Sequence, residues 1–185
     1  MLPGMIRNLL ALLIAVALAA VGCSGAGSGT SDPPAVRPDV EAWQTIALRD
    51  VRTQETFRIA DLRGKLVAIE AIAIWCANCK TQQAEAAAAI AEIGSPDLVY
   101  ISLDVDPNEQ EADLAEYARR EGFDWRFAVA SPDVARSLVA AHGPQVLSPP
   151  ATPVILVAPD GRVIEVQTGI RSADELVADL RAHLP

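Results

Sequence analysis

The sequence predicts one α/β domain whose mixed β-sheet carries helices on both faces. Residues 66–74 and 98–103 are almost uniformly apolar, as expected for strands that are covered on both sides. Segments of high helix propensity alternate with these strands. A turn at residues 159–161 separates two short apolar runs, which is typical of a hairpin. The 185 residues are enough for one ordinary domain with a leader, but not for two full domains.

Seven strands follow from the apolar runs and from the turn residues between them. A turn or a single helical coil is expected at residues 59–62, between the second and third strands. The order of strands and helices is then β, β, β, α, β, α, β, α, β, β, α. Strands are expected at residues 43–48, 53–58, 66–74, 98–103, 127–130, 154–158 and 163–168.

Four helices are expected, and each has a recognisable start or end. The alanine-rich first helix ends at Gly94, and the second stops at Gly122. Ser131 is a good cap for the third helix, and the proline that follows it suits the first turn. Ser172 and Glu175 form a capping box that opens the last helix. The helices are expected at residues 76–93, 110–121, 132–142 and from 173 onward.

The composition excludes several classes of protein. The chain has 24 acidic and 15 basic residues, a net charge of -9, and no basic run longer than the pair Arg119-Arg120. Nucleic acid is therefore not an expected partner. A hydrophobic content of 51% and continuous apolar runs exclude a disordered or fibrous chain. Three cysteines are too few for a miniprotein held together by disulfides.

Residues 1–22 predict an export signal. Arg7 precedes an apolar stretch at residues 9–21, which as a helix would rise only about 20 Å against a hydrocarbon core of ~30 Å. The end of this stretch, A-V-G-C at residues 20–23, resembles the lipobox of bacterial lipoproteins. That resemblance implies lipidation of Cys23 and a location at the extracytoplasmic face of a bacterial membrane. The alternative is a plain cleaved signal in which the cysteine has no role.

Residues 23–39 contain almost nothing to bury and are rich in glycine, serine and proline. They predict a flexible tether whose ends would lie about 20–25 Å apart. The folded domain is expected at residues 40–185.

The motif W-C-A-N-C-K, residues 75–80, stands where the first long strand gives way to a helix. The start of a helix presents unsatisfied amide groups and the positive end of its dipole, and both favour a thiolate at Cys76. Cys79 follows about one helical turn later, close enough to form a disulfide. The pKa of such a first cysteine can fall from ~8.5 to ~3.5–7.5. The spacing therefore favours disulfide exchange.

Two other interpretations of the cysteine pair are weaker. A structural zinc site needs about four ligands, but Cys23 lies in the leader, and His142 and His183 are far apart in sequence. No metal site is therefore expected. A purely structural disulfide between residues three apart would close too small a loop to stabilise the chain much. No cofactor is expected beyond the redox-active pair itself.

Several motifs together resemble the thioredoxin superfamily, especially its membrane-tethered TlpA/ResA-like branch. They are L-R-G-K-L-V at residues 62–67, the W-C-x-x-C motif, Thr152-Pro153 before an apolar strand, and P-D-G-R-V at residues 159–163. The resemblance covers nearly all of residues 43–183. It implies a thioredoxin-like fold with an N-terminal hairpin and a central strand–helix insertion.

The same resemblance implies roles for individual residues. Cys76 would be the nucleophile and Cys79 the resolving thiol. Pro153 would be a cis proline beside them, and the backbone of Thr152 would contact the partner chain. Trp75 alone suggests a partly buried packing residue, whereas the family pattern makes it a shield for the sulfurs.

Glu70 breaks the apolar pattern of its strand, six residues before Cys76, where thioredoxin has its buried acid. Six extended residues cover ~20 Å, so contact with the sulfurs is implied by the resemblance and not by the spacing. A buried carboxyl should have a raised pKa, which suits an acid or base that serves Cys79. The alternative is a hydrated glutamate at a strand end, or one paired with a basic side chain.

Two rival functions share parts of the pattern. Residues 102–107, 114–118 and 124–127 also resemble Sco-type copper-handling proteins, but those use C-x-x-x-C and a histidine just before the late strand. Here His142 lies eleven residues before Pro153, and a histidine in a last helical turn is more often a dipole partner. Asp104 and Asp106 could suggest a metal site, although a solvated loop after the strand is the simpler expectation.

A thiol peroxidase is the third candidate. The peroxiredoxin pattern has a threonine three residues before its reactive cysteine, where this chain has Ala73. The sequence therefore predicts a lipid-tethered, extracytoplasmic thiol–disulfide oxidoreductase. The resemblance implies protein thiols and disulfides as partners, with apocytochrome c as a plausible client and a membrane electron donor as the source of electrons.

Overall fold

The structure is a computed structural model that describes residues 40–185. The expected export signal at residues 1–22, the lipidation site Cys23 and the tether at residues 23–39 lie outside the described residues. Between residues 40 and 185, no helix is both long enough and apolar enough to cross a bilayer.

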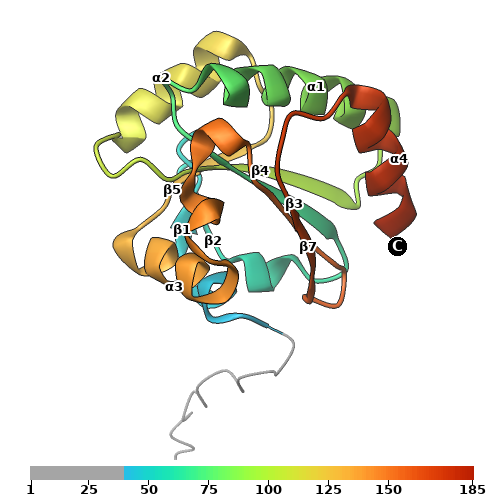
Figure 1. Cartoon of the computed structure of the whole chain (residues 1–185), viewed down its shortest axis with the longest axis horizontal. Helices are drawn as coiled ribbons and strands as arrows, with labels where there is room; N and C mark the ends of the chain where they lie inside the picture. Colours follow the sequence, from blue (N-terminus) through green and yellow to red (C-terminus); the bar gives the residue numbers. More distant parts are fainter. Residues whose placement is uncertain (1–39) are drawn as a thin grey trace, which may run out of the picture. The chain divides into compact units, whose positions relative to one another are not determined.

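Five strands form the central sheet in the order β5-β4-β3-β6-β7 (Figure 1). β3 pairs with β4, and β4 with β5, in parallel, whereas β6 runs antiparallel to both β3 and β7. The sheet is therefore mixed, as predicted. The strands are β3 (Leu66–Ile72), β4 (Leu98–Asp104), β5 (Arg126–Val129), β6 (Val154–Val157) and β7 (Val163–Gln167).

Helices cover both faces of this sheet, as predicted. In Figure 1, α1 and α4 lie above the sheet and α3 lies below it. A second, two-stranded antiparallel sheet joins β1 (Leu48–Arg49) to β2 (Thr56–Phe57), which confirms the N-terminal hairpin. The helices are α1 (Ala77–Ile93), α2 (Glu111–Glu121), α3 (Pro132–His142) and α4 (Ala173–His183).

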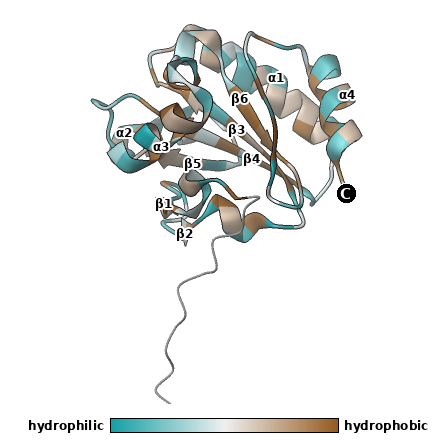
Figure 2. Cartoon of the chain, turned by 60° about the horizontal axis from the view of Figure 1, so that its bottom comes forward, coloured by the Kyte–Doolittle hydropathy of each residue, from teal (hydrophilic) through white to brown (hydrophobic). Residues whose placement is uncertain are grey.

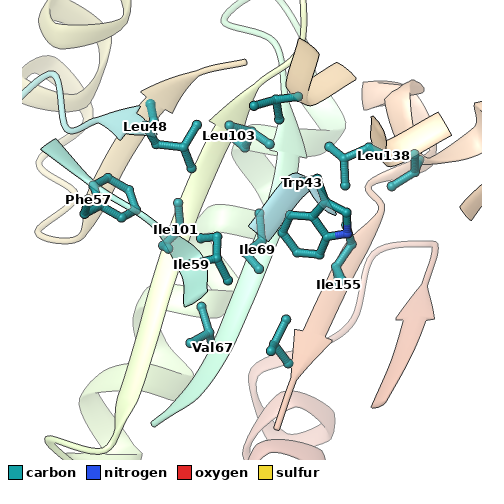
Figure 3. Packing of buried hydrophobic residues seen from close by; sticks show 14 residues of the cluster. Trp43, Leu48, Phe57, Ile59, Val67, Ile69, Ile101, Leu103, Leu138 and Ile155 are labelled. Atoms are coloured by element: carbon teal, nitrogen blue, oxygen red, sulfur yellow. The ribbon is translucent and has the colours of Figure 1, made fainter. Parts of the chain in front are cut away.

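Successive side chains of β3 point to opposite faces of the sheet and so belong to two separate parts of the core. Leu66 and Ala68 pack with α1 and α4 on one face, whereas Val67 and Ile69 pack with α3 on the other. The strands accordingly show mostly hydrophobic colours, while hydrophilic residues lie along the helices (Figure 2). Figure 3 shows the α3 side of the core, where the indole of Trp43 points among apolar side chains.

One predicted strand is wrong. Residues 43–48 were expected to be extended, but Ala42–Thr45 form a short 3-10 helix, η1, and β1 covers only Leu48–Arg49. A capping box between Glu41 and Gln44 closes this turn. The turn also buries Trp43 and Gln44 together, whereas a strand would send consecutive side chains to opposite faces.

The strand expected at residues 53–58 is reduced to β2 (Thr56–Phe57), and the other predicted strands and helices are confirmed with small shifts at their ends. The coil expected at residues 59–62 is a 3-10 helix, η2 (Ile59–Leu62). Two further 3-10 helices, η3 (Pro144–Leu147) and η4 (Pro149–Ala151), were not expected. Both begin with proline, which suits the first position of a helix because it has no N–H to leave unsatisfied. η4 leads directly to the Thr152-Pro153 pair.

The two ends of β3 have different neighbours: the turn at residues 159–161 lies at its amino end, and the cysteine motif follows its carboxyl end. At the amino end, Gly64 donates its N–H to the carbonyl of Pro159 at 2.9 Å, and Gln44 donates to the carbonyl of Gly161 at 3.0 Å. The side chain of Val40, the first described residue, lies beside Gly161. The cysteine motif follows the carboxyl end of the same strand.

Replacement of Trp43 should show how much the α3 side of the core depends on it. Trp43 is 2% exposed, so Trp43→Ala should lower the free energy of unfolding by about 3–5 kcal/mol, through lost burial and the cavity left behind. Urea unfolding would measure the change. Ile170→Ala is the control, because Ile170 is 47% exposed and should change stability by about 0.5 kcal/mol or less. Equal losses for the two variants would contradict this account.

Candidate functional site

A disulfide between Cys76 and Cys79 sits at the first turn of α1. Cys76 is the residue that caps the helix, and its Sγ accepts the backbone N–H of Cys79 at 3.2 Å. The two Cα atoms are 5.3 Å apart, within the usual range for a disulfide. The sulfur of Cys76 therefore occupies the place that a capping oxygen normally takes.

The two sulfurs differ in access and share one electrostatic setting. Cys76 is 4% exposed and Cys79 is fully buried, so Cys76 is the residue that a partner can reach. The free amide groups and the positive end of the α1 dipole stabilise negative charge on the capping sulfur. When the disulfide is reduced, this position favours a thiolate at Cys76.

The segment from Pro149 to Pro153 lies against the cysteine motif. Asn78 donates its side-chain amide to the carbonyl of Pro150 at 2.9 Å, and the Sγ of Cys79 lies 3.3 Å from the carbonyl oxygen of Pro149. Once reduced, the Cys79 thiol can donate to that carbonyl. These contacts of Asn78 and Pro149 could not be predicted from the sequence, because they join parts of the chain about 70 residues apart.

Thr152 and Pro153 are both buried at the end of this segment. Thr152 has φ 46°, a left-handed conformation that is uncommon for a β-branched residue, and it donates its N–H to Pro149 at 2.8 Å. Pro153 accepts the N–H of Ala71 at 3.0 Å, which fixes the pair against the end of β3. The predicted cis peptide bond at Pro153 stays a prediction.

Glu70 is fully buried on the face of β3 that α1 covers. Its Oε2 accepts a hydrogen bond from the hydroxyl of Tyr100 at 2.9 Å, and its Oε1 has no partner among residues 40–185. Burial raises the pKa of the Glu70 carboxyl from 4.5 to about 8, although the bond from Tyr100 opposes this rise. The hydrated or salt-bridged alternative for Glu70 does not match this environment.

A buried polar network next to Glu70 was not found from the sequence. Gln83 on α1 donates to the hydroxyl of Ser102 at 2.9 Å, and Tyr117 of α2 donates to Gln83. Trp125 also donates its indole N–H to Ser102, at 2.9 Å. The available signal was a pair of glutamines on the helix face that carries Cys79, in an otherwise alanine-rich segment. The network joins α1, α2 and β4 beneath the disulfide.

Two residues of the motif, Trp75 and Lys80, have partners that the sequence did not predict. Trp75 is 61% exposed and not a partly buried packing residue, and its indole donates to Asp106 at 2.7 Å. Lys80 forms an ion pair with Glu121, with 2.7 Å between Nζ and Oε2, so it is not simply solvated. Because the charge of Lys80 is paired with Glu121, the positive end of the α1 dipole is the main group that stabilises negative charge on Cys76.

Asp104 is the last residue of β4 and is fully buried, so it does not lie in the expected solvated loop. His142 lies in the last turn of α3, 2.7 Å from a carboxylate oxygen of Glu41 and edge-on to Trp43. These contacts place it at the η1 side of the domain, so they do not support a copper site with the sulfurs.

One group of three side chains within residues 40–185 could hold a metal ion: Glu165, Asp179 and His183. It includes neither cysteine of the motif. Gln167 donates to both of its carboxylates, at 2.5 Å and 2.7 Å, and Arg171 pairs with Asp179. Existing hydrogen bonds and an ion pair therefore already occupy these carboxylates.

The scan of protein families and the search of curated proteins both find no match for this chain. Solved structures do resemble it. A thiol:disulfide interchange protein from Chlorobium tepidum superposes with a TM-score of 0.63 at 18% identity, over 80% of this chain and 99% of the other. The chain has the thioredoxin fold.

Two further structures with this fold show its range. The structure of MTB dsbF superposes over 77% of this chain and 98% of the dsbF chain, with a TM-score of 0.58 and 19% identity. Copper-bound ScoI from Arabidopsis thaliana matches 75% and 94%, with a TM-score of 0.60 and 16% identity. The predicted fold class is thus confirmed. Within the thioredoxin fold, the disulfide stands at the junction of β3 and α1, and the segment that leads to Thr152-Pro153 contacts the cysteine motif through Pro149 and Pro150.

The buried carboxyl of Glu70 should make stability depend on pH. Because its pKa is raised in the folded state, the folded protein binds more protons between about pH 4.5 and 8, and stability falls as pH rises through this range. Glu70→Gln should remove this dependence of stability on pH. The stability of wild type relative to Glu70→Gln should therefore fall by at most about 1.4 kcal/mol per pH unit over this window.

Urea unfolding at several pH values would measure this difference, with the exposed Glu55→Gln as control. The difference between wild type and the control should stay flat from pH 4.5 to 8. A flat difference for Glu70→Gln as well would show that Glu70 is not a buried acid.

Proposed function

We propose that this chain is an extracytoplasmic thiol–disulfide oxidoreductase that exchanges electrons with protein disulfides through Cys76 and Cys79. The observation that carries the proposal is the sulfur of Cys76, which caps the start of α1 and is bonded to a second, fully buried sulfur. The thioredoxin fold supports it, since it is shared with a thiol:disulfide interchange protein.

The proposed reaction has two exchange steps. The thiolate of Cys76 attacks one sulfur of a partner disulfide, the partner's S–S bond breaks, and the released partner sulfur takes a proton. Cys79 then loses its proton and attacks the sulfur of Cys76, which releases the second partner sulfur as a thiol. Two electrons pass to the partner, and the Cys76–Cys79 disulfide forms. The reverse sequence oxidises a partner dithiol.

The buried residues have distinct parts in these steps. Glu70 would accept the proton of Cys79 in the second step, because a carboxyl with a pKa of about 8 is suited to proton transfer near neutral pH. Thr152 and Pro153 would place the backbone of the partner beside Cys76. Trp75, which is exposed, would contact the partner at the entrance to the site.

The proposed location rests on residues 1–23. The export signal and the lipobox-like A-V-G-C support an anchor of acyl chains on Cys23, which holds a protein on a membrane without a spanning helix. Partners would then be exported proteins with thiols or disulfides, apocytochrome c among them. A membrane donor would supply electrons if the protein reduces its clients. A potential near ~-270 mV would mark a reductase, and one near ~-120 mV an oxidase.

Single cysteine variants test the assignment of the two sulfurs. Cys79→Ala should accumulate covalent complexes with partner proteins, because the mixed disulfide on Cys76 is not resolved. Cys76→Ala should form no such complexes and should lose exchange activity. Non-reducing gels and an exchange assay with a protein disulfide would show both results. Normal turnover by Cys76→Ala would contradict the proposed function.

The anchor is tested separately from the chemistry. Cys23→Ala in the full chain should move the protein from the membrane fraction to the soluble fraction and abolish incorporation of labelled fatty acid. Disulfide exchange by the purified protein should not change, because Cys23 has no part in it. Retention of the label by Cys23→Ala would refute the lipidation site and leave the redox proposal intact.

A further inference from the structure

The loop after β4 runs along the backbone that leads to Cys76. Val105 donates its N–H to the carbonyl of Ile72 at 2.9 Å. The carboxylate of Glu109 accepts the N–H of Ile74, at 2.8 Å and 3.1 Å for its two oxygens. Together with the Trp75–Asp106 bond, these contacts hold the last residue of β3 and two of the three residues between β3 and the reactive cysteine.

Asp104 lies at the base of this loop. It is fully buried, its Oδ1 accepts the N–H of Asp106 at 2.9 Å, and its Oδ2 has no donor among the described residues. Burial raises the pKa of Asp104 to about 8, and the carboxyl of Glu109 adds to the rise through a hydrogen bond and its charge. Two adjacent charged carboxylates, one fully buried and one partly buried, would repel each other. A proton between them would supply the donor that Oδ2 lacks.

The other ionisable groups around Asp104 do not supply this donor. Asp106 is an acid as well, and it acts to raise the pKa of Asp104 through its charge. The neighbouring strands bring the uncharged Ile72 and Val129 opposite Asp104. The surrounding elements carry further ionisable residues, among them Glu70 on β3, Arg126 on β5, and Tyr117 on α2, whose pKa Glu109 helps to raise.

We propose that Asp104 and Glu109 share one proton and form a carboxyl clamp that positions residues 74–76, and with them the attacking sulfur of Cys76. The clamp consists of these two side chains and acts through the Ile74 N–H. The inference rests on the proposed function, because it concerns the first exchange step. Asp104 and Glu109 are positioning residues, since neither is in contact with a sulfur.

The clamp has a definite consequence at high pH. When the shared proton is lost, Asp104 and Glu109 both carry charge, and movement of the more exposed Glu109 away from Asp104 would relieve the repulsion. The Ile74 N–H then loses its acceptor, and the segment that carries Cys76 loosens. The rate of the first step should fall above about pH 8, whereas deprotonation of the Cys76 thiol alone could only raise that rate.

Reduced protein with Cys79→Ala isolates the first step, because Cys79 and its proton transfer are then absent. The attack of Cys76 on Ellman's disulfide should slow above about pH 8. Adding Asp104→Asn should abolish this fall, since the asparagine amide can donate to Glu109 at every pH. Glu109→Gln should also abolish it, because its amide can donate to Asp104 while its oxygen accepts from Ile74. Glu109→Ala should slow the attack on the order of ten- to a hundredfold at every pH.

Glu116→Gln is the matched control, because Glu116 is an exposed acid on α2, outside the clamp. It should keep the wild-type pH profile. A spectroscopic readout is also available, because the Ile74 amide resonance should shift with a midpoint near pH 8 in wild type and should not shift in Asp104→Asn. If Asp104→Asn does not fold, Glu109→Gln provides the same two measurements.

The outcomes separate this proposal from the proposed function. Identical pH profiles for wild type, Asp104→Asn and Glu109→Gln, with no titration of the Ile74 amide, would overturn the clamp while leaving exchange chemistry intact. No attack by Cys76 on the probe at any pH would instead defeat the proposed function itself.

Discussion

The site depends on one interaction, the contact between the sulfur of Cys76 and the N–H of Cys79 at the start of α1. This contact makes the sulfur a helix cap, so negative charge on it is stabilised by the backbone of α1 and not by a nearby cation. Lys80, the obvious cation in the motif, is instead paired with Glu121. The rest of the domain serves to hold this helix start against the end of β3 and against the Thr152-Pro153 segment.

Most of the fold could be predicted because local patterns and packing agree. The apolar runs of β3 and β4 and the capping box at Ser172 identify elements by themselves, and a mixed sheet follows from their order. The strand expected at residues 43–48 failed because Trp43 is a strong strand former whose burial here requires a helical turn. The 3-10 helices after α3 were missed because prolines mark irregular chain without specifying its form.

The sequence identified the parts of the site that lie next to one another in the chain, or that a known motif carries. It identified Glu70 because an acid breaks an apolar strand. The contacts of Asn78, Tyr100 and Glu109 were not predictable, because each joins segments 30 or more residues apart. Asp104 was expected to be solvated, and only the packing of its loop against residues 72–75 shows that it is buried. Long-range packing determines the ionisation of these acids.

The neighbours of the two ends of β3 affect how partners could reach the sulfurs if the proposed anchor holds the chain at a membrane. Val40 lies near the Gly161 turn at the amino end of the strand, and Cys76 follows the carboxyl end, about 23 Å away for seven extended residues. If the chain is held through the residues before Val40, as proposed, the attachment lies at the other end of β3 from the reactive sulfur and leaves that sulfur uncovered. Clients in solution could then reach it. An electron donor in the same bilayer would then need a domain that projects toward Cys76. Otherwise the thioredoxin-fold domain would have to rotate on its proposed tether.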